Sequence, residues 1–161
     1  MTLLFSTRSR NQKKENINSF FVSADTFPQT LALLETRARP LGIKLEIAQS
    51  SKFDPEKNYF GAFFQYPGLS GNINDIEPII QICKEHEIKV AVAADILSLA
   101  LLKSPGEMGA DVVVGSTQRF GIPLGYGGPH AAYFSTKEEF KRNLPGRIIG
   151  VSIDENGNRA L

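Results

Sequence analysis

Short apolar runs alternate along the chain with longer segments in which apolar residues recur every three or four positions. The short runs predict strands at residues 19–23, 43–47, 61–66, 89–95, 111–115 and 131–135. Residues 61–66 and 89–95 are apolar at nearly every position, so we expect both faces of these strands to be buried. Residues 43–47 alternate strictly, which indicates a strand with one buried face.

Helices are predicted between the strands. The first begins at Pro28 and ends before Pro40, and Asp25 or Thr26 is expected to cap it. Its apolar face consists of Phe27, Leu31, Leu34 and Ala38. Asn74 is expected to cap the second helix. The apolar face of that helix consists of Ile76, Ile79, Ile80 and Cys83.

Two shorter helical signals follow. Residues 96–102 predict a short helix, and Thr136 with Glu139 forms a capping box that opens a helix carrying Phe140. Strands and helices in this alternation predict an α/β fold with a mainly parallel sheet and flanking helices.

The ends of the sequence suggest a domain that is not complete. Residues 1–5 are mostly apolar, and residues 148–153 look like a further structured segment followed by an Asn-Gly turn. We therefore expect residues 1–161 to form a single incomplete α/β domain that is cut at both ends.

Composition narrows the class of protein. The 161 residues include 18 Lys and Arg and 17 Asp and Glu, a net charge of +1, which gives no reason to expect nucleic acid or an acidic membrane as a partner. The basic residues Arg8, Arg10, Lys13 and Lys14 are expected to form a solvated face. One cysteine, Cys83, allows no internal disulfide, and no apolar run reaches the roughly 20 residues of a spanning helix. An intracellular location is expected.

Two features could carry chemistry. Asp95 closes a buried strand, at the end of a parallel sheet where ligands bind. The alternative is that its carboxylate caps the next turn by accepting from the amide of Leu97 or Ser98. Residues 115–130 form a glycine-rich segment that either brings backbone amides close to an anion or is simply an unusual turn. It matches neither the Walker pattern nor the dinucleotide fingerprint.

The histidines give no sign of a metal site. His86 lies in a charged helix tail, where it is expected to be solvated and to favour the helix C-terminus. His130 directly precedes a predicted strand. Neither has a cysteine or carboxylate at ligand spacing, and no Gly-x-Ser-x-Gly elbow supports a serine nucleophile.

Four ordered motifs closely resemble one protein family. They read ADILSL at residues 94–99, SPGEMG at 104–109, DVVVGSTQRFGIPLGYGGPH at 111–130 and PGRIIGVS at 145–152. The sequence resembles the pyridoxal-phosphate-dependent glycine decarboxylase, the P-protein of the glycine cleavage system, over essentially its whole length. The resemblance implies part of the large domain of a fold-type I pyridoxal-phosphate enzyme.

The resemblance also implies an activity and its partners. The parent enzyme would decarboxylate glycine and pass the aminomethyl group to the lipoyl arm of H-protein. The family is built from two related halves, fused or separate, and the catalytic half would be the partner of this one. The location would be the cytoplasm in bacteria or the mitochondrial matrix in eukaryotes.

One departure from the family motif decides which half the chain resembles. The catalytic half carries a His-Lys-Thr motif whose lysine forms the Schiff base, and Gln118 stands at that position here. An amide nitrogen cannot form an aldimine because its lone pair is delocalised. We therefore expect this N-terminal half to hold no covalent cofactor and to be inactive alone.

The resemblance also implies matches for other residues of the family's cofactor site, although Gln118 replaces the lysine. Asp95 matches the aspartate that pairs with the cofactor's pyridine nitrogen. The candidate cofactor-binding residues are Asp95, Gln118, Gly125, Gly127, Gly128 and His130. Two alternatives remain open: a scaffold for the catalytic half and H-protein, and a separate enzyme that binds a phosphate ligand noncovalently in residues 121–130.

Overall fold

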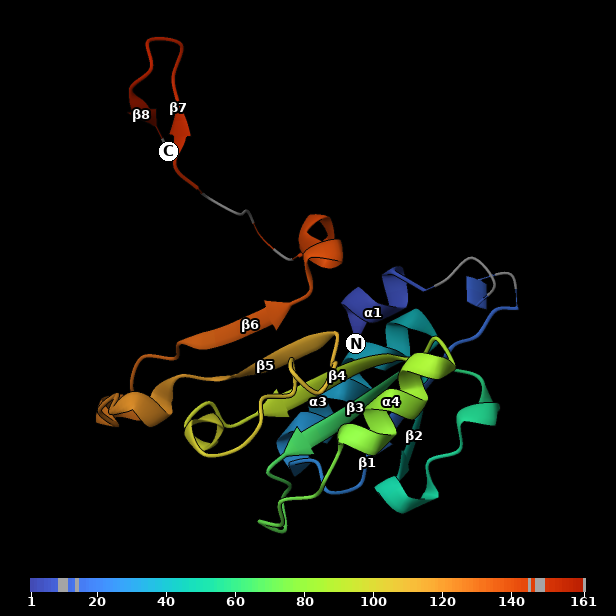
Figure 1. Cartoon of the computed structure of the whole chain (residues 1–161). Helices are drawn as coiled ribbons and strands as arrows, with labels where there is room; N and C mark the ends of the chain where they lie inside the picture. The colour runs from blue at the N-terminus through green and yellow to red at the C-terminus, as the bar shows by residue number, and fades with distance from the viewer. Residues whose placement is uncertain (9–11, 14, 145, 147–149, 161) are drawn as a thin grey trace.

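The six predicted strands form one sheet (Figure 1). The computed structural model describes residues 1–8, 12–13, 15–144, 146 and 150–160. Its strands are β1 (Ser19–Ser23), β2 (Lys44–Ala48), β3 (Tyr59–Tyr66), β4 (Lys89–Ala94), β5 (Val112–Ser116) and β6 (Ala132–Thr136). They are arranged in the order β2-β1-β3-β4-β5-β6. Neighbours from β2 to β5 are parallel, and β6 runs antiparallel to β5. The predicted α/β class is confirmed.

Helices cover both faces of the sheet. The α-helices whose bounds lie within the described residues are α1 (Thr2–Ser6), α3 (Pro28–Ala38) and α4 (Glu77–Glu85). Short 3-10 turns lie at Arg39–Leu41, Ser50–Lys52, Pro55–Lys57, Ser98–Ala100, Gln118–Phe120, Gly125–Gly127 and Glu138–Asn143. A separate two-stranded hairpin joins β7 (Ser152–Ile153) to β8 (Arg159–Ala160) across the predicted Asn-Gly turn. The predicted start of that segment, residues 148 and 149, lies outside the described residues.

Successive strand residues pack into two cores, one on each face of the sheet, because side chains alternate between the faces of a pleated sheet. In β1, Phe21 belongs to the core beneath α4, whereas Phe20 and Val22 belong to the core beneath α1 and α3. All three are fully buried. The helices contribute Ile80 and Cys83 from α4 to the first core, and Leu4, Leu34 and Ala38 from α1 and α3 to the second. The predicted apolar faces therefore point inward.

Two predicted helix caps are wrong. Helix α3 has no side-chain cap, and the Asp25 carboxylate instead accepts from the backbone N–H of Ser70 at 2.9 Å and its hydroxyl at 3.0 Å. Asn74 donates to Asp25 at 3.4 Å, and α4 begins without a side-chain cap. Both side chains tie the loop after β3 to the loop after β1. Thr26 is fully buried.

The predicted capping box is also wrong. The Thr136 hydroxyl donates to the carbonyl of Asp111 at 2.7 Å, and the segment carrying Phe140 is a 3-10 turn without a side-chain cap. The short helix expected at residues 96–102 is reduced to a 3-10 turn.

Two further expectations need correction. The buried face expected for residues 43–47 forms only in part: Ile43 is buried and Leu45 packs against the core beneath α1 and α3, whereas Ile47 on the edge strand β2 is exposed. Arg8 is not part of a solvated face, because its guanidinium stacks 3.8 Å above the Phe5 ring and donates to the carbonyl of Ile17. Lys13 is exposed as expected, whereas residues 10 and 14 lie outside the described residues.

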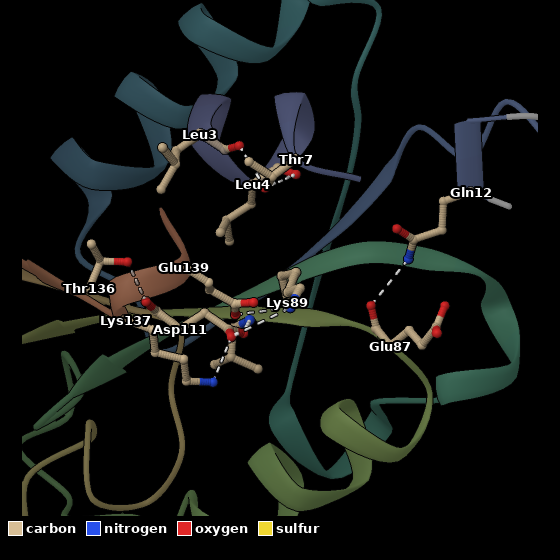
Figure 2. A network of polar contacts seen from close by, with 11 residues as sticks. Leu3, Leu4, Thr7, Gln12, Glu87, Lys89, Asp111, Thr136, Lys137 and Glu139 are labelled. Carbon is tan, nitrogen blue, oxygen red and sulfur yellow. Dashed lines mark hydrogen bonds and ion pairs between the residues drawn. The ribbon is translucent and has the colours of Figure 1, made fainter. Parts of the chain in front are cut away.

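A buried carboxylate joins three strands at the amino ends of β4 and β5 (Figure 2). Asp111 accepts from the backbone N–H of Val90 at 2.8 Å and from Lys137 Nζ at 2.7 Å. Lys89 Nζ lies 3.8 Å from the same carboxylate and 3.6 Å from Glu139. This network fixes one end of β4, β5 and β6, opposite the end that carries the candidate site.

Among the helices that the structure describes, none has the length and apolar character needed to cross a bilayer.

Candidate functional site

The candidate site lies where β4 and β5 end. Asp95 directly follows β4, and its backbone N–H donates to the carbonyl of Tyr66 at 3.0 Å. Gln118 lies two residues beyond β5. Because parallel strands end at the same edge of a sheet, the loops after β4 and β5 are brought together there.

Both carboxylate oxygens of Asp95 have partners within the chain. Oδ1 accepts from the backbone N–H of Leu97 at 3.0 Å, which confirms the capping alternative. Oδ2 lies 3.1 Å from Nε of Arg119 in an ion pair. The Asp95 side chain is 28% exposed and that of Arg119 is 62% exposed. Arg119 is a site residue that the sequence analysis missed.

Gln118 connects the end of β5 to the glycine-rich segment. Its backbone N–H donates to the Ser116 hydroxyl at 3.1 Å, and that hydroxyl donates to Gln118 Oε1 at 3.3 Å. Its Nε2 donates to the carbonyl of Gly127 at 3.5 Å. The Gln118 side chain therefore makes hydrogen bonds to the end of β5 and within the glycine-rich segment.

The glycine-rich segment uses its amides internally. The N–H of Gly127 donates to Leu124 at 3.1 Å, and that of Gly128 donates to Gly125 at 2.8 Å. Gly128 has φ +68°, and a Cβ there would lie 2.4 Å from the carbonyl oxygen of Pro123. The turn therefore requires a glycine at position 128. The two amides turn into the loop, which favours the alternative of an unusual turn over an anion cradle.

His130 and Gln118 border one open hollow. Its volume is about 530 Å³, and side chains of β5 and β6, including Val114 and Phe134, form its wall. His130 is exposed. Asp95 and the three candidate glycines do not line this hollow. The structure therefore bonds Gln118 to Gly127 and places it on the hollow that His130 also borders, whereas Asp95 pairs with Arg119.

Tyr133 is a second residue that the sequence analysis missed. Its hydroxyl donates to the carbonyl of Ala94 at 2.8 Å, immediately before Asp95. Burial, and then the nearby charge of Asp95, raise the pKa of the Tyr133 phenol. The ring packs over Gly115, where a Cβ would lie 2.5 Å from Tyr133 Cε1. A glycine inside an apolar strand was the available signal, since it marks a close approach.

Large apolar side chains project from the same loops. Leu101 is 93% exposed, Leu124 is 83% exposed, and Phe120 and Tyr126 are also exposed. Tyr126 has a left-handed backbone with φ 50°, which is uncommon for a residue with a Cβ.

These residues do not fit a pyridoxal-type cofactor. The amide of Gln118 cannot provide the covalent link. The Asp95 carboxylate, which would have to face a ring nitrogen, is already held by Leu97 and Arg119. The amides of Gly127 and Gly128 bond inside the loop instead of facing a phosphate.

Comparison with known proteins places this arrangement in a family. The family model described as "Glycine cleavage system P-protein" matches residues 3–161. The chain belongs to this family. It is 62% identical to "Glycine dehydrogenase (decarboxylating)" of Flavobacterium johnsoniae over all 161 residues, which are 17% of that relative. The chain thus spans about a sixth of the curated P-proteins that it matches.

Solved structures agree with the family assignment. The crystal structure of glycine decarboxylase (P-protein) in inhibitor-bound form matches 98% of this chain and 36% of its own, with a TM-score of 0.81 and 29% identity. An O-acetylhomoserine (thiol)-lyase from Campylobacter jejuni, solved with N'-pyridoxyl-lysine-5'-monophosphate, covers 61% of this chain and 25% of its own. It has a TM-score of 0.51 and 24% identity, so it supports the fold alone.

Proposed function

We propose that this chain serves a P-protein that decarboxylates glycine and passes the aminomethyl group to the lipoyl arm of H-protein, and that the chain is its lysine-lacking, non-catalytic half. The family match over residues 3–161, combined with Gln118 in the lysine position, carries this proposal. The hydrogen bonds of Gln118 to Ser116 and Gly127 support a structural role for this side chain.

Relative chain lengths support the two-half organisation. Nearly the same stretch is 36% of the solved P-protein and 17% of the Flavobacterium relative, so the curated relative is about twice as long as the solved chain. A doubled length is what two fused halves would give. Pyridoxal phosphate would then be attached in the other half, with glycine as substrate.

The proposal is tested on the whole P-protein that contains this sequence. With lipoylated H-protein, it should release carbon dioxide from carboxyl-labelled glycine, and Gln118→Glu should retain most of that turnover. Residues 1–161 alone should release none. Glycine-dependent release by the isolated chain, or complete loss of turnover in Gln118→Glu, would contradict the proposal.

A scaffold role within the same assembly is favoured by the exposed apolar side chains Leu101, Phe120, Leu124 and Tyr126. Exposed large apolar side chains on loops are a surface that a protein partner can cover. The purified chain should then capture the catalytic half or lipoylated H-protein, and Leu124→Asp should weaken capture. We propose the bacterial cytoplasm, or the mitochondrial matrix in a eukaryote, as the location.

A further inference from the structure

We propose that the Asp95–Arg119 ion pair is an internal latch that fixes the glycine-rich segment to the end of β4 and occupies the carboxylate that a cofactor would need. The proposal goes beyond glycine decarboxylation and does not depend on it. It assigns Arg119 as a positioning residue, with no role in touching substrate.

The latch joins the connection after β4 to the connection after β5. Asp95 begins the loop after β4, whereas Arg119 lies in the 3-10 turn Gln118–Phe120 after β5. The Asp95 carboxylate is held in place from its own side by the N–H of Leu97, so its second oxygen is presented to Arg119 at 3.1 Å. One oxygen thus fixes the orientation of the carboxylate, and the other binds Arg119.

Adjacent bonds pass this constraint into the glycine-rich segment. Gln118 precedes Arg119 in the same turn and donates to Gly127 at 3.5 Å. Thr117 donates through both its N–H and its hydroxyl to the carbonyl of Ala131, at 3.0 and 3.1 Å. The turn is therefore tied to the C-terminal part of the loop, and among the described residues Arg119 is its single ionic tie to the end of β4.

The consequence for a ligand follows from charge. A carboxylate with a free oxygen attracts a protonated ring nitrogen, but the Asp95 oxygen that does not accept from Leu97 is already paired with the Arg119 guanidinium, a permanent cation. A second cation there would be repelled by Arg119 and would have to displace it. The geometry thus explains how Asp95 can be present without serving a cofactor.

Hydrogen exchange on the whole P-protein tests the latch. Because an exposed ion pair is worth little individually, Arg119→Ala and Asp95→Asn should each speed amide exchange in residues 117–128 by about 2- to 5-fold. The double variant should exchange no faster than the faster single variant, since both changes remove one interaction. Unchanged exchange, or effects that multiply in the double variant, would overturn the proposal.

Salt dependence separates the ionic tie from simple packing. Raising ionic strength from about 0.05 to 0.5 M should speed exchange in the unmodified protein but leave Arg119→Ala nearly unchanged, because salt screens partly exposed charges. A matched control is the exposed pair Lys103–Glu77, 2.6 Å apart and outside this loop. Lys103→Ala should not change exchange in residues 117–128. Equal salt dependence with and without Arg119 would overturn the ionic latch.

Cofactor titration provides the remaining readout. Pyridoxal phosphate bound per whole protein, measured by absorbance, should be the same in Asp95→Asn as in the unmodified protein. A loss of bound cofactor in that variant would overturn the claim that Arg119 occupies Asp95. If the unmodified protein fails to decarboxylate glycine, the proposed function fails, whereas the exchange results still decide the latch.

Discussion

The packing at the end of β5 leaves no space for a side chain at position 115. Gly115 lies between the carbonyl oxygen of Ala94 and the Tyr133 ring, and a Cβ would come within 2.3 Å of the first and 2.5 Å of the second. The Tyr133 hydroxyl needs this approach to donate to Ala94. The absence of a side chain at one position therefore holds the β4, β5 and β6 ends together beside Asp95.

Gly115→Ala should therefore destabilise the fold. Overpacking against backbone and a buried ring costs about 1–3 kcal/mol, so the midpoint of urea unfolding should fall. Gly106→Ala is the matched control, because nothing lies within 4 Å of its Cβ position. An unfolding midpoint equal in the two variants would contradict the close packing of Tyr133 over Gly115.

The buried thiol gives a second test at this scale. Burial, followed by the charge of Asp111, raises the pKa of Cys83 to about 12, against about 8.5 for a free thiol. Between these values an unfolded chain loses the thiol proton and the folded chain keeps it, so folding stability should fall as pH rises through this window.

Cys83 should also be unreactive in the folded protein. At about pH 9 we expect alkylation to be at least ~100-fold slower than in guanidinium chloride, because reaction requires opening of the core. Peptide mass spectrometry of the alkylated protein measures the rate at this residue. Rapid alkylation under native conditions would show that Cys83 is accessible.

Among the elements, strands were predictable and caps were not. Alternation and apolar runs placed β1 and β4 within a residue of their observed bounds, because these patterns reflect burial along the strand itself. Caps depend on which polar group lies nearest in space. Asp25 bonds Ser70, and Thr136 bonds Asp111, through contacts that span 45 and 25 residues.

The same limit applies to the site. Asp95 could be predicted because the end of a buried strand is a defined place in an α/β sheet. Its partner Arg119 comes from the next connection, and only the parallel pairing of β4 with β5 brings the two together. Gln118 was identified through the family motif, whereas its bond to Gly127 depends on how the loop folds back.

Asp111 joins β4, β5 and β6 at the end of the strands opposite Gly115. Asp111→Asn removes the charge facing Lys137 and Lys89 while retaining the size of the side chain (Figure 2). The loss should cost about 1–3 kcal/mol, since hydrogen bonds to buried charged groups are worth more than neutral ones. Glu138→Gln, at an exposed surface pair, is the control and should leave urea unfolding unchanged. Equal stability of both variants would contradict a role for Asp111 in joining these strands.

At the scale of the whole molecule, the structure confirms the predicted class of fold but does not test whether the domain is complete. A mainly parallel sheet with helices on both faces follows from the pattern of runs, and the structure has this architecture. The expected cut at both ends stays a prediction. Position 118 carries Gln, which cannot form a Schiff base, and the proposed function therefore expects the covalent link to the cofactor outside residues 1–161.

Borohydride trapping of the whole P-protein tests this central claim most directly. Reduction converts a lysine Schiff base into a stable pyridoxyl-lysine, which peptide mass spectrometry locates. The account predicts the label on a lysine outside residues 1–161 and none within them. A pyridoxyl-lysine inside residues 1–161 would contradict it.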